Sequence, residues 1–464
     1  MKPRSAKTKV ALLGVDIGSS SIKATLFDEL GRTLGTAAKS VPVCFPRKGW
    51  VERDPEATLR AAQAVIRAVA KSSRLSATAI ALTGCGNGGV FLDAKFSPLG
   101  AGILASDSRA KDFVAPRGTR PDEPYPGQTG PLLDWWRSSE SPRARELAHV
   151  LWWKDYVRMS LTGVACSDFT DAGAAGLLDL TTRSWKKNRP ELPPLQESTA
   201  LAGRVTPAVA HKTNLPSGTP VFTGCIDCEA AAIGSGVSEP DQLSIVAGTW
   251  SINQAFVDVP PSSTNVFLAN PSSQPGRWLL LEGSPTSASH FDWLVRAIRG
   301  RSDFTKVAAL AAAAPASDLL FLPRLFAEQS AFVGLGPQHD LGAMARAVMA
   351  GVAYSHRAHV EKLRAQGLRF RVARLAGGAT RSPFWCQLFA DVLGIRIEVP
   401  AVAEPGALGA ALIAGVGAGI WPTLAEAQRA TVRVDRTFEP HAPTREFHHR
   451  AYARFQQLSV LRFP

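Results

Sequence analysis

The stretch VDIGSSSIK, residues 15–23, recurs in altered form near the middle of the chain as VAGTWSIN, residues 246–253. Each copy follows an apolar run and precedes a second strand-like run, so each predicts a β-hairpin with a tight turn of glycine and hydroxyl residues. The tip of such a hairpin exposes backbone N–H groups and small side chains, which let a phosphate approach the backbone closely. Two such tips, one in each half of the chain, predict a phosphate chain gripped from both sides.

The two copies differ at one informative position. When Gly18 is aligned with Gly248, Asp16 corresponds to Val246. Only the first copy therefore brings a carboxylate that could organise a metal ion. The plain alternative is that both copies are ordinary turns, because Gly and Ser are common in turns. A single copy would favour that alternative, whereas two copies in matching contexts favour phosphate binding.

The composition is that of a globular protein, with 464 residues, of which 45% are hydrophobic and 20% charged. This length predicts two or three domains. No apolar run approaches the roughly 20 residues of a membrane-spanning helix. The N-terminal start is basic and then apolar, but its apolar stretch ends too early, at Asp16, for a signal peptide. We therefore expect a cytoplasmic protein that has no membrane partner.

The formal net charge of the chain is +13. Lys and Arg are spread from end to end and do not gather in a stripe, which argues against nucleic-acid binding and favours a positive surface that attracts anionic metabolites. The six cysteines are scattered, and the pair Cys225 and Cys228 has no second pair at zinc-finger spacing. We expect reduced, packed cysteines.

The predicted elements of the N-terminal half alternate between strands and helices. Strand-like runs at 10–15, 22–27 and 32–39 precede a helix that begins at Asp54-Pro55, a capping carboxylate followed by proline at the first helical position. Another strand follows this helix. Three sequential strands followed by helix and strand indicate a mixed α/β sheet.

The stretch 181–220 is rich in Pro, Ser, Thr and charge, and we interpret it as a long surface excursion. A domain boundary is predicted near 237–241, which divides the chain into domains of residues 1–239 and 240–464. In the second domain, a strand at 372–376 runs into Gly377-Gly378 and a following helix. Paired glycines before a helix N-terminus are a suitable place for a nucleotide.

The glycine-rich GCGNGG, residues 84–89, matches the dinucleotide pattern GxGxxG, but a strand-like run follows where the Rossmann fold needs a helix. The loop is better placed to line a cleft; a simple turn is the alternative. Asp227 lies between a strand and a helix of small residues, where it could cap the helix or accept a proton from a hydroxyl that attacks phosphorus. Asp107 and Arg109 could form a surface ion pair or bind a polyhydroxylated ligand.

With these residues identified, the chain resembles the FGGY carbohydrate kinases over nearly its whole length. The resemblance is carried by six motifs: VDIGSSSIK (15–23), GWVERDPE (49–56), KDYVRMSLTG (154–163), GCIDCEAAAIG (224–234), AGTWS (247–251) and GGATRSPFWCQLFADVLG (377–394). Within the family the chain is most similar to the L-xylulose kinase branch, through 83–110 and 282–293, and erythritol kinases are similar in the same segments. The resemblance implies two ribonuclease-H-like α/β domains, of the actin, sugar-kinase and Hsp70 type, around a catalytic cleft.

The resemblance also implies site roles. Asp227 aligns with the catalytic base, which also contacts the substrate, and Asp16 with the carboxylate that holds Mg²⁺, usually through water. The residues implied for ATP are Gly18, Ser19, Ser20 and Lys23 in the first phosphate loop, Gly248 and Thr249 in the second, and Gly377, Gly378 and Ala379 at the adenosine. Those implied for the sugar are Asn87, Asp107 and Arg109.

The function implied by the resemblance is ATP-dependent phosphorylation of a small sugar, a ketopentose such as L-xylulose, with an erythritol or other polyol kinase as the alternative. An alternative of another class is a non-catalytic actin-like scaffold or sugar sensor. A homodimer is an assembly that the resemblance allows. Cys85 stands where the family often has His or Gln, and Cys228 beside the base replaces a commoner neighbour. Both departures concern substrate identity and leave the phosphoryl-transfer residues intact.

Overall fold

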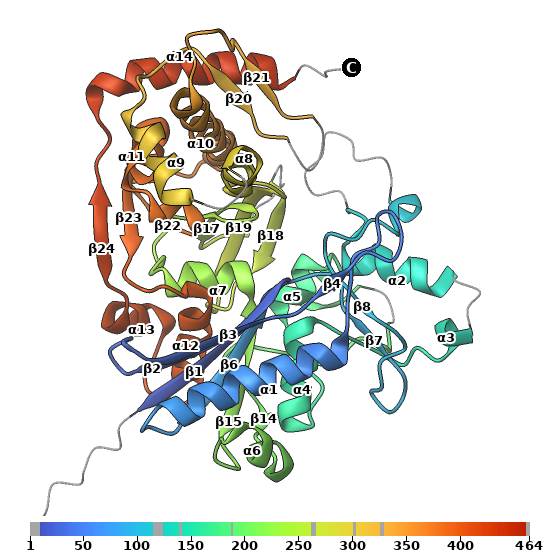
Figure 1. Cartoon of the computed structure of the whole chain (residues 1–464). Helices are drawn as coiled ribbons and strands as arrows, with labels where there is room; N and C mark the ends of the chain where they lie inside the picture. The colour runs from blue at the N-terminus through green and yellow to red at the C-terminus, as the bar shows by residue number, and fades with distance from the viewer. Residues whose placement is uncertain are drawn as a thin grey trace, which may run out of the picture.

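The computed structural model describes residues 10–114, 124–138, 142–186, 189–260, 266–299, 303–324 and 329–460. Within these residues the chain forms two lobes, each built on one large mixed sheet, with helix α7 (Asp227–Gly234) where they meet (Figure 1). None of the described helices is long and apolar enough to cross a membrane.

The sheet of the N-terminal lobe has the strand order β14-β15-β6-β1-β2-β3. Its first three strands in sequence are antiparallel neighbours, β6 adds in parallel beside β1, and β15 adds in parallel beside β6. This arrangement confirms the mixed α/β sheet that the sequence predicts. The strands are β1 (Ala11–Ile17), β2 (Ser21–Asp28), β3 (Thr33–Ser40), β6 (Ala79–Gly84), β14 (Leu201–Arg204) and β15 (Pro220–Ile226).

The sheet of the C-terminal lobe repeats this plan, with the order β18-β19-β17-β16-β22-β23-β24. Strand β16 pairs antiparallel with β17 on one side and parallel with β22 on the other, as β1 pairs with β2 and β6. The repeat confirms the predicted duplicated fold. The strands are β16 (Gln242–Ala247), β17 (Ser251–Val257), β18 (Leu268–Pro271), β19 (Trp278–Ser284), β22 (Val372–Ala376), β23 (Arg396–Pro400) and β24 (Val434–Phe438).

Several helices, including α1, begin at local capping signals. The Asp54 side chain accepts the N–H of Glu56 at the start of α1 (Pro55–Ser72), which confirms the predicted helix start. Its apolar face, including Val65, Ile66 and Val69, is buried. The other long helices are α2 (Thr129–Ser138), α4 (Trp153–Thr162), α8 (Ser289–Arg299), α9 (Phe304–Ala313), α10 (Leu341–Ala365), α11 (Pro383–Leu393), α12 (Pro405–Gly417) and α14 (Ala442–Ser459).

Shorter elements complete the two lobes. The short helices are α3 (Pro142–Arg145), α5 (Phe169–Ala174), α6 (Pro207–Thr213), α13 (Leu424–Thr431) and the 3₁₀ turns Lys111–Phe113 and η2 (Gly378–Arg381). The short strands are β4 (Val43–Cys44), β5 (Glu52–Arg53), β7 (Val90–Leu92), β8 (Gly102–Ile103), β9 (His149–Leu151), β10 (Ser167–Asp168), β11 (Leu178–Asp179), β12 (Ser184–Trp185), β13 (Leu195–Gln196), β20 (Leu320–Leu322) and β21 (Ala331–Val333). The strand β7 directly after the glycine-rich loop confirms the rejection of a Rossmann fingerprint.

Helix α12 belongs to the C-terminal half in sequence but packs against the N-terminal sheet. A Cβ on Gly14 of β1 would lie 1.8 Å from the carbonyl oxygen of Ala407, and one on Gly409 would lie 1.9 Å from that of Ala230 in α7. Only glycine permits such close approach, so α12 lies tightly between β1 and α7. The predicted division after residue 239 stays a prediction. Helix α12, which belongs to the later half of the chain, supplies part of the core of the first lobe.

The interpretation of residues 181–220 as a long surface excursion is wrong for part of the stretch. Residues 201–204 form the edge strand β14, paired antiparallel with β15, and Ala202 is buried against the sheet. The strand continues into Val205, also buried, and then into α6. Four residues are too few to show strand periodicity, so the polar composition of the neighbouring residues concealed the element.

Candidate active site

Three neighbouring parallel strands of the first sheet end at one level. The pairing register aligns Ile17 of β1 with Gly84 of β6, and Gly84 with Ile226 of β15. Asp16 is therefore one residue before this level and Asp227 one residue after it. Because ligands of α/β sheets bind beyond the carboxyl ends of the strands, this edge is the natural place for a site. The structure thus brings together two acids that lie far apart in the sequence.

A β-bulge sets the direction of the chain just before Asp227. The register between β15 and β6 shifts between Phe222 and Cys225. Gly224, inside the shift, has φ +82°, and a Cβ there would lie 1.7 Å from the carbonyl oxygen of Leu82. Only glycine can occupy this position, and such a bulge bends the strand just before Asp227. Asp227 is the first residue of α7 and not its N-cap, which is Ile226, so the helix-capping alternative does not apply.

The two acids have pKa values well above that of an ordinary aspartate. Burial raises the pKa of Asp227 to about 6, opposed by the N–H of Cys228. Burial, reinforced by the negative charge of Asp227, raises the pKa of Asp16 to about 7, while Lys23 acts in the opposite direction. The Asp227 carboxylate is thus mostly ionised at neutral pH, and its raised pKa makes it a stronger proton acceptor than an ordinary aspartate, as a general base requires.

The first hairpin meets the C-terminal half at the start of α12. The ammonium group of Lys23 lies 2.7 Å from a carboxylate oxygen of Glu404, and both side chains are about one-third exposed. A Cβ on Gly406 would lie 3.0 Å from Oδ2 of Asp16. At the tip of the hairpin Ser19 and Ser20 are exposed. Glu404 and the first turn of α12 therefore lie against Lys23 and Asp16.

The surroundings of Asp16 fit a magnesium ion. Its Oδ1 is buried and has no hydrogen-bond partner. The described residues hold no cluster of three or more His, Cys, Asp or Glu side chains that could bind a metal by themselves. Magnesium is usually bound through one or two carboxylates, waters and substrate phosphates, not by an all-protein cage. A single carboxylate with an unused oxygen, beside a hairpin predicted to bind phosphate, fits this mode of magnesium binding.

The second hairpin has a shorter turn and lies against the predicted adenosine segment. Ala247 pairs with Ser251, whereas in the first hairpin Ile17 pairs with Ile22, so the second turn is one residue shorter. Gly377, with φ +93°, would place a Cβ 2.5 Å from the carbonyl oxygen of Ala247. The structure therefore brings the predicted residues of the second phosphate loop and the paired glycines together.

The other nucleotide residues differ in exposure. Thr249 and Gly377 are exposed, while Gly378 is half-buried. Ala379 is fully buried in η2. Of the three residues predicted at the adenosine, the two glycines offer the accessible surface.

The predicted sugar residues lie on loops, Asn87 shortly after the end of β6 and Asp107 with Arg109 after β8. The Asp107 carboxylate accepts the Arg109 Nε–H at 2.9 Å and a second guanidinium N–H at 2.8 Å, and it also accepts the backbone N–H of Val51. Both side chains are buried, so they are not a surface ion pair. Asn87 adopts φ +62°, and its side-chain oxygen accepts the N–H of Thr129 at 3.4 Å.

Several residues of the motif GWVERDPE join the site although the sequence argument assigned them no role. Trp50 stacks on the guanidinium of Arg109, 3.8 Å from its ring centroid, and Glu52 accepts a hydrogen bond from the same group. Arg53 reaches the first hairpin. Glu404, the partner of Lys23, was also missed. The motif itself was the available signal, because it concentrates aromatic and charged residues next to a helix start.

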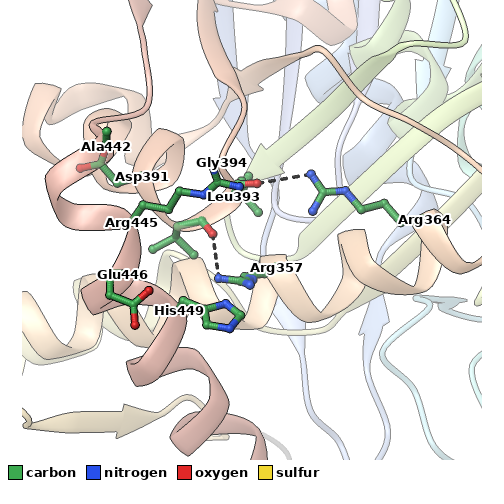
Figure 2. A pocket seen from close by; sticks show the side chains of 10 residues that line it. Arg357, Arg364, Asp391, Leu393, Gly394, Ala442, Arg445, Glu446 and His449 are labelled. Atoms are coloured by element: carbon green, nitrogen blue, oxygen red, sulfur yellow. Dashed lines mark hydrogen bonds between the residues drawn. The ribbon is translucent and has the colours of Figure 1, made fainter.

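A cavity of about 670 Å³ lies elsewhere, between α10, α11 and α14 (Figure 2). It contains none of the predicted site residues. Two of its arginines, Arg357 and Arg364, donate to the carbonyl oxygens of Val392 and Leu393 at 3.3 Å each, as Figure 2 shows. These are the last carbonyls of α11, which lack partners within the helix and favour cations. The basic lining therefore has a structural explanation.

Two lobes of one plan, with two acids at the strand ends of the first and a glycine-containing hairpin in each, form the arrangement expected of a sugar kinase. The N-terminal domain of the FGGY family of carbohydrate kinases matches residues 11–234, and the C-terminal domain of that family matches residues 243–418. The chain belongs to this family. It is therefore an ATP-dependent enzyme that transfers a phosphoryl group to an alcohol of a carbohydrate, which confirms the predicted enzyme class.

Individual relatives match over nearly the whole chain. The L-xylulose/3-keto-L-gulonate kinase of Escherichia coli K12 is 31% identical over 480 residues, covering 96% of each protein. A probable L-xylulose kinase of Pasteurella multocida is 30% identical, covering 97% of this chain and 98% of the relative.

Solved structures agree with the fold. The xylulose kinase of Rhodospirillum rubrum superposes with a TM-score of 0.86 at 25% identity, covering 97% of this chain and 98% of that one. A Plasmodium falciparum glycerol kinase, solved with ADP, gives 0.85 at 18% identity, covering 98% of this chain and 99% of that one, and shows likeness of fold alone.

Proposed function

We propose that the protein transfers the γ-phosphoryl group of ATP to a primary hydroxyl of a small ketose, with L-xylulose as the first candidate. The observation that carries the proposal is the convergence of Asp16, Asp227 and the first hairpin at one edge of the N-terminal sheet. The choice of L-xylulose is supported by relatives that are named for this activity and match almost end to end.

Asp227 is assigned as the general base. Its carboxylate orients the attacking hydroxyl and accepts the proton late in an in-line displacement. The raised pKa of about 6 suits this role, because the group is mostly ionised at neutral pH and is not too weak a base. Gly224 supports the assignment, since the bulge that it permits fixes where Asp227 begins its helix.

The phosphate chain is assigned to the two hairpins. Backbone N–H groups at Gly18, Ser19 and Ser20 bind from one lobe, and those at Gly248 and Thr249 bind from the other. Lys23, released from Glu404, supplies a cation to the transferring group. A magnesium ion, when bound, offsets the negative charge that develops on the phosphates. Asp16 would hold it, usually through water, with its unused buried oxygen.

The sugar is assigned to the loops around Asn87 and Arg109. Asp107 uses its oxygens to fix Arg109 and the backbone at Val51, so it acts as a support for the arginine and not as a free acceptor. Cys85, the residue that follows β6, is a weak hydrogen-bonding group. A smaller, less polar wall at this point is the reason to keep erythritol and other polyols as a second candidate class.

A direct assay separates the candidates. ADP release, coupled to NADH oxidation, is measured with L-xylulose, D-xylulose, 3-keto-L-gulonate, L-ribulose and erythritol, with Asp227→Asn protein as the control for contaminating kinases. We expect the highest kcat/KM with L-xylulose. A clear preference for erythritol would replace the ketose assignment. ATP turnover that no sugar or polyol stimulates would favour the non-catalytic alternative, an actin-like scaffold or sugar sensor.

A further inference from the structure

Arg53 is a fully buried arginine without a carboxylate partner in the described chain. Its Nη1 donates to the carbonyl oxygens of Gly18 at 2.6 Å and Ser19 at 3.2 Å. Its guanidinium lies 3.9 Å from the ring centroid of Trp153. Nε and Nη2 are buried and have no hydrogen-bond partner. A buried cation therefore lies directly behind the tip of the first phosphate hairpin.

Other buried cations of this lobe are paired. Lys154 lies within 3 Å of carboxylate oxygens of three aspartates, and Arg158 is 2.7 Å from one of them. Arg109 is paired with Asp107 and Glu52. An unpaired buried charge is expensive to hold, and stacking on an aromatic face offsets only part of that cost. Burial accordingly lowers the pKa of Arg53. Among the residues that the structure describes, no carboxylate pairs with this buried cation.

The contacts of Arg53 also orient the hairpin tip. A peptide unit points its N–H opposite to its C=O, so a guanidinium that holds the carbonyls of Gly18 and Ser19 turns the N–H groups of Ser19 and Ser20 away from itself. Ser19 and Ser20 are the exposed residues of the tip. Neither N–H donates to another backbone group in the hydrogen bonds outside the regular elements. Both are therefore presented outward for an acceptor.

We infer that Arg53 is the positioning residue of the first phosphate hairpin, and that its missing counter-anion is the phosphate chain of the nucleotide. The inference rests on the proposed function, because it takes this hairpin as a phosphate site. Arg53 acts through the peptides of Gly18 and Ser19 and through its charge, without touching the substrate. The free energy that the protein loses by burying this unpaired charge is offset when the phosphate chain binds.

This role predicts that removing Arg53 weakens ATP binding without lowering the stability of the free protein, which a purely structural role does not predict. Arg53→Met removes an unpaired cation and the hairpin contacts together. We expect the melting temperature without ligand to be unchanged or higher, and the stabilisation by ATP to shrink. The affinity for ATP should fall by about tenfold or more, as for loss of one favourable charged contact. The affinity for adenosine, which lacks phosphates, should not change.

The matched control is Arg357→Met. Arg357 also lies over an aromatic ring, 4.1 Å from the centroid of Tyr452, and donates to a backbone carbonyl, but it has a carboxylate partner in Glu361. It lies on α10, at the cavity of Figure 2. We expect this variant to melt at a lower temperature and to gain as much stability from ATP as the wild type does.

Melting curves and calorimetric titrations with ATP and with adenosine, for the wild type and both variants, test the inference. It is overturned if Arg53→Met melts lower than the wild type, as Arg357→Met is expected to, and keeps the full gain from ATP. A wild type that gains nothing from ATP overturns the proposed function, and the inference with it.

Steady-state kinetics of Arg53→Lys give a second measurement, for the case in which Arg53→Met does not fold. Lysine keeps the charge but cannot hold two carbonyls as a fork. We expect KM for ATP to rise several-fold, with KM for the sugar unchanged. An equal rise in both KM values would contradict a role confined to the phosphate hairpin.

Discussion

The two lobes share a backbone plan but differ in charge at equivalent positions. At the strand ends of the first lobe stand Asp16 and Asp227, whereas in the second lobe Val246 aligns with Asp16, and Ala401 follows β23, the strand that pairs in parallel with β22 as β15 does with β6. The duplicated sheet therefore keeps its geometry while only one copy keeps the acids. Under the proposed function, this difference teaches that the fold supplies a turn for the phosphates in each lobe, whereas only the first lobe supplies the acids that the reaction needs.

The supports behind the two hairpins differ in the same way. Arg53, a cation, holds the first tip. The second is braced by His356, whose Nδ1–H donates to Asn253 at 2.8 Å while Ser287 lies 2.8 Å from its Nε2 and Ser251 lies 3.2 Å from the ring. Burial keeps the pKa of His356 well below its ordinary value, so the ring is neutral. One lobe is charged behind its turn and the other is not.

The largest expected effect comes from removing the base that the second lobe lacks. Asp227→Asn keeps the size of the side chain but cannot accept the proton, so kcat should fall by about 10²- to 10⁴-fold. Nucleotide affinity, measured by calorimetry, should be retained because the phosphate hairpins are intact. A kcat within a few-fold of the wild type would show that another group acts as the base.

The next effect tests the single acid of the first hairpin. Asp16→Asn should raise the Mg²⁺ concentration needed for half-maximal activity by about 10- to 100-fold, as for other groups that hold a metal through its outer shell. The matched control at the aligned position is Val246→Ala, for which the Mg²⁺ requirement should not change. Equal metal dependence in both variants would remove the distinction between the hairpins.

A third prediction uses the pKa of Asp227. Because its pKa in the folded protein is raised to about 6, the carboxylate becomes protonated as the pH falls through this value, and the base is lost. We expect kcat/KM for the sugar to fall about tenfold per pH unit below pH 6 and to level off above it. The profile is measured between pH 5 and 8 at saturating Mg²⁺. A flat profile down to pH 5 would contradict the assignment.

The smallest effect is expected at His356, the neutral residue behind the second hairpin. His356→Ala leaves Ser251 and Asn253 without their buried partner, which should lower the free energy of unfolding by about 1–3 kcal/mol. KM for ATP should rise only a few-fold, and the Mg²⁺ requirement should stay at the wild-type value. Denaturant titration measures the free energy of unfolding, and steady-state kinetics measure KM for ATP and the Mg²⁺ requirement. A large change in metal dependence would mean that the second hairpin also serves the metal.

The local parts of this fold could be predicted from the sequence. The strand at residues 372–376 has the predicted bounds, and the helix after Asp54 begins where its cap and proline place it. Both signals lie within a few residues of the element that they define. The paired hairpins were predicted for the same reason, because each turn carries its own glycine and hydroxyl pattern.

The parts that sequence reasoning missed depend on distant contacts. Arg53 acquires a role only when its side chain meets residues 18 and 19, and Glu404 only when it meets Lys23, 381 positions earlier. The edge strand at 201–204 gains its identity from its partner β15. No local period or cap marks such meetings. The motif GWVERDPE pointed to the segment that contains Arg53 without saying what this residue does.

The late helix α12 has a consequence for synthesis on the ribosome. Residues 405–417 fill the space between β1 and α7, with Leu408 and Leu412 buried there. The first lobe therefore emerges with an uncovered apolar face that stays open until almost the whole chain has been made. A nascent chain stalled near residue 240 would expose this face, and we expect it to require chaperone protection or to aggregate.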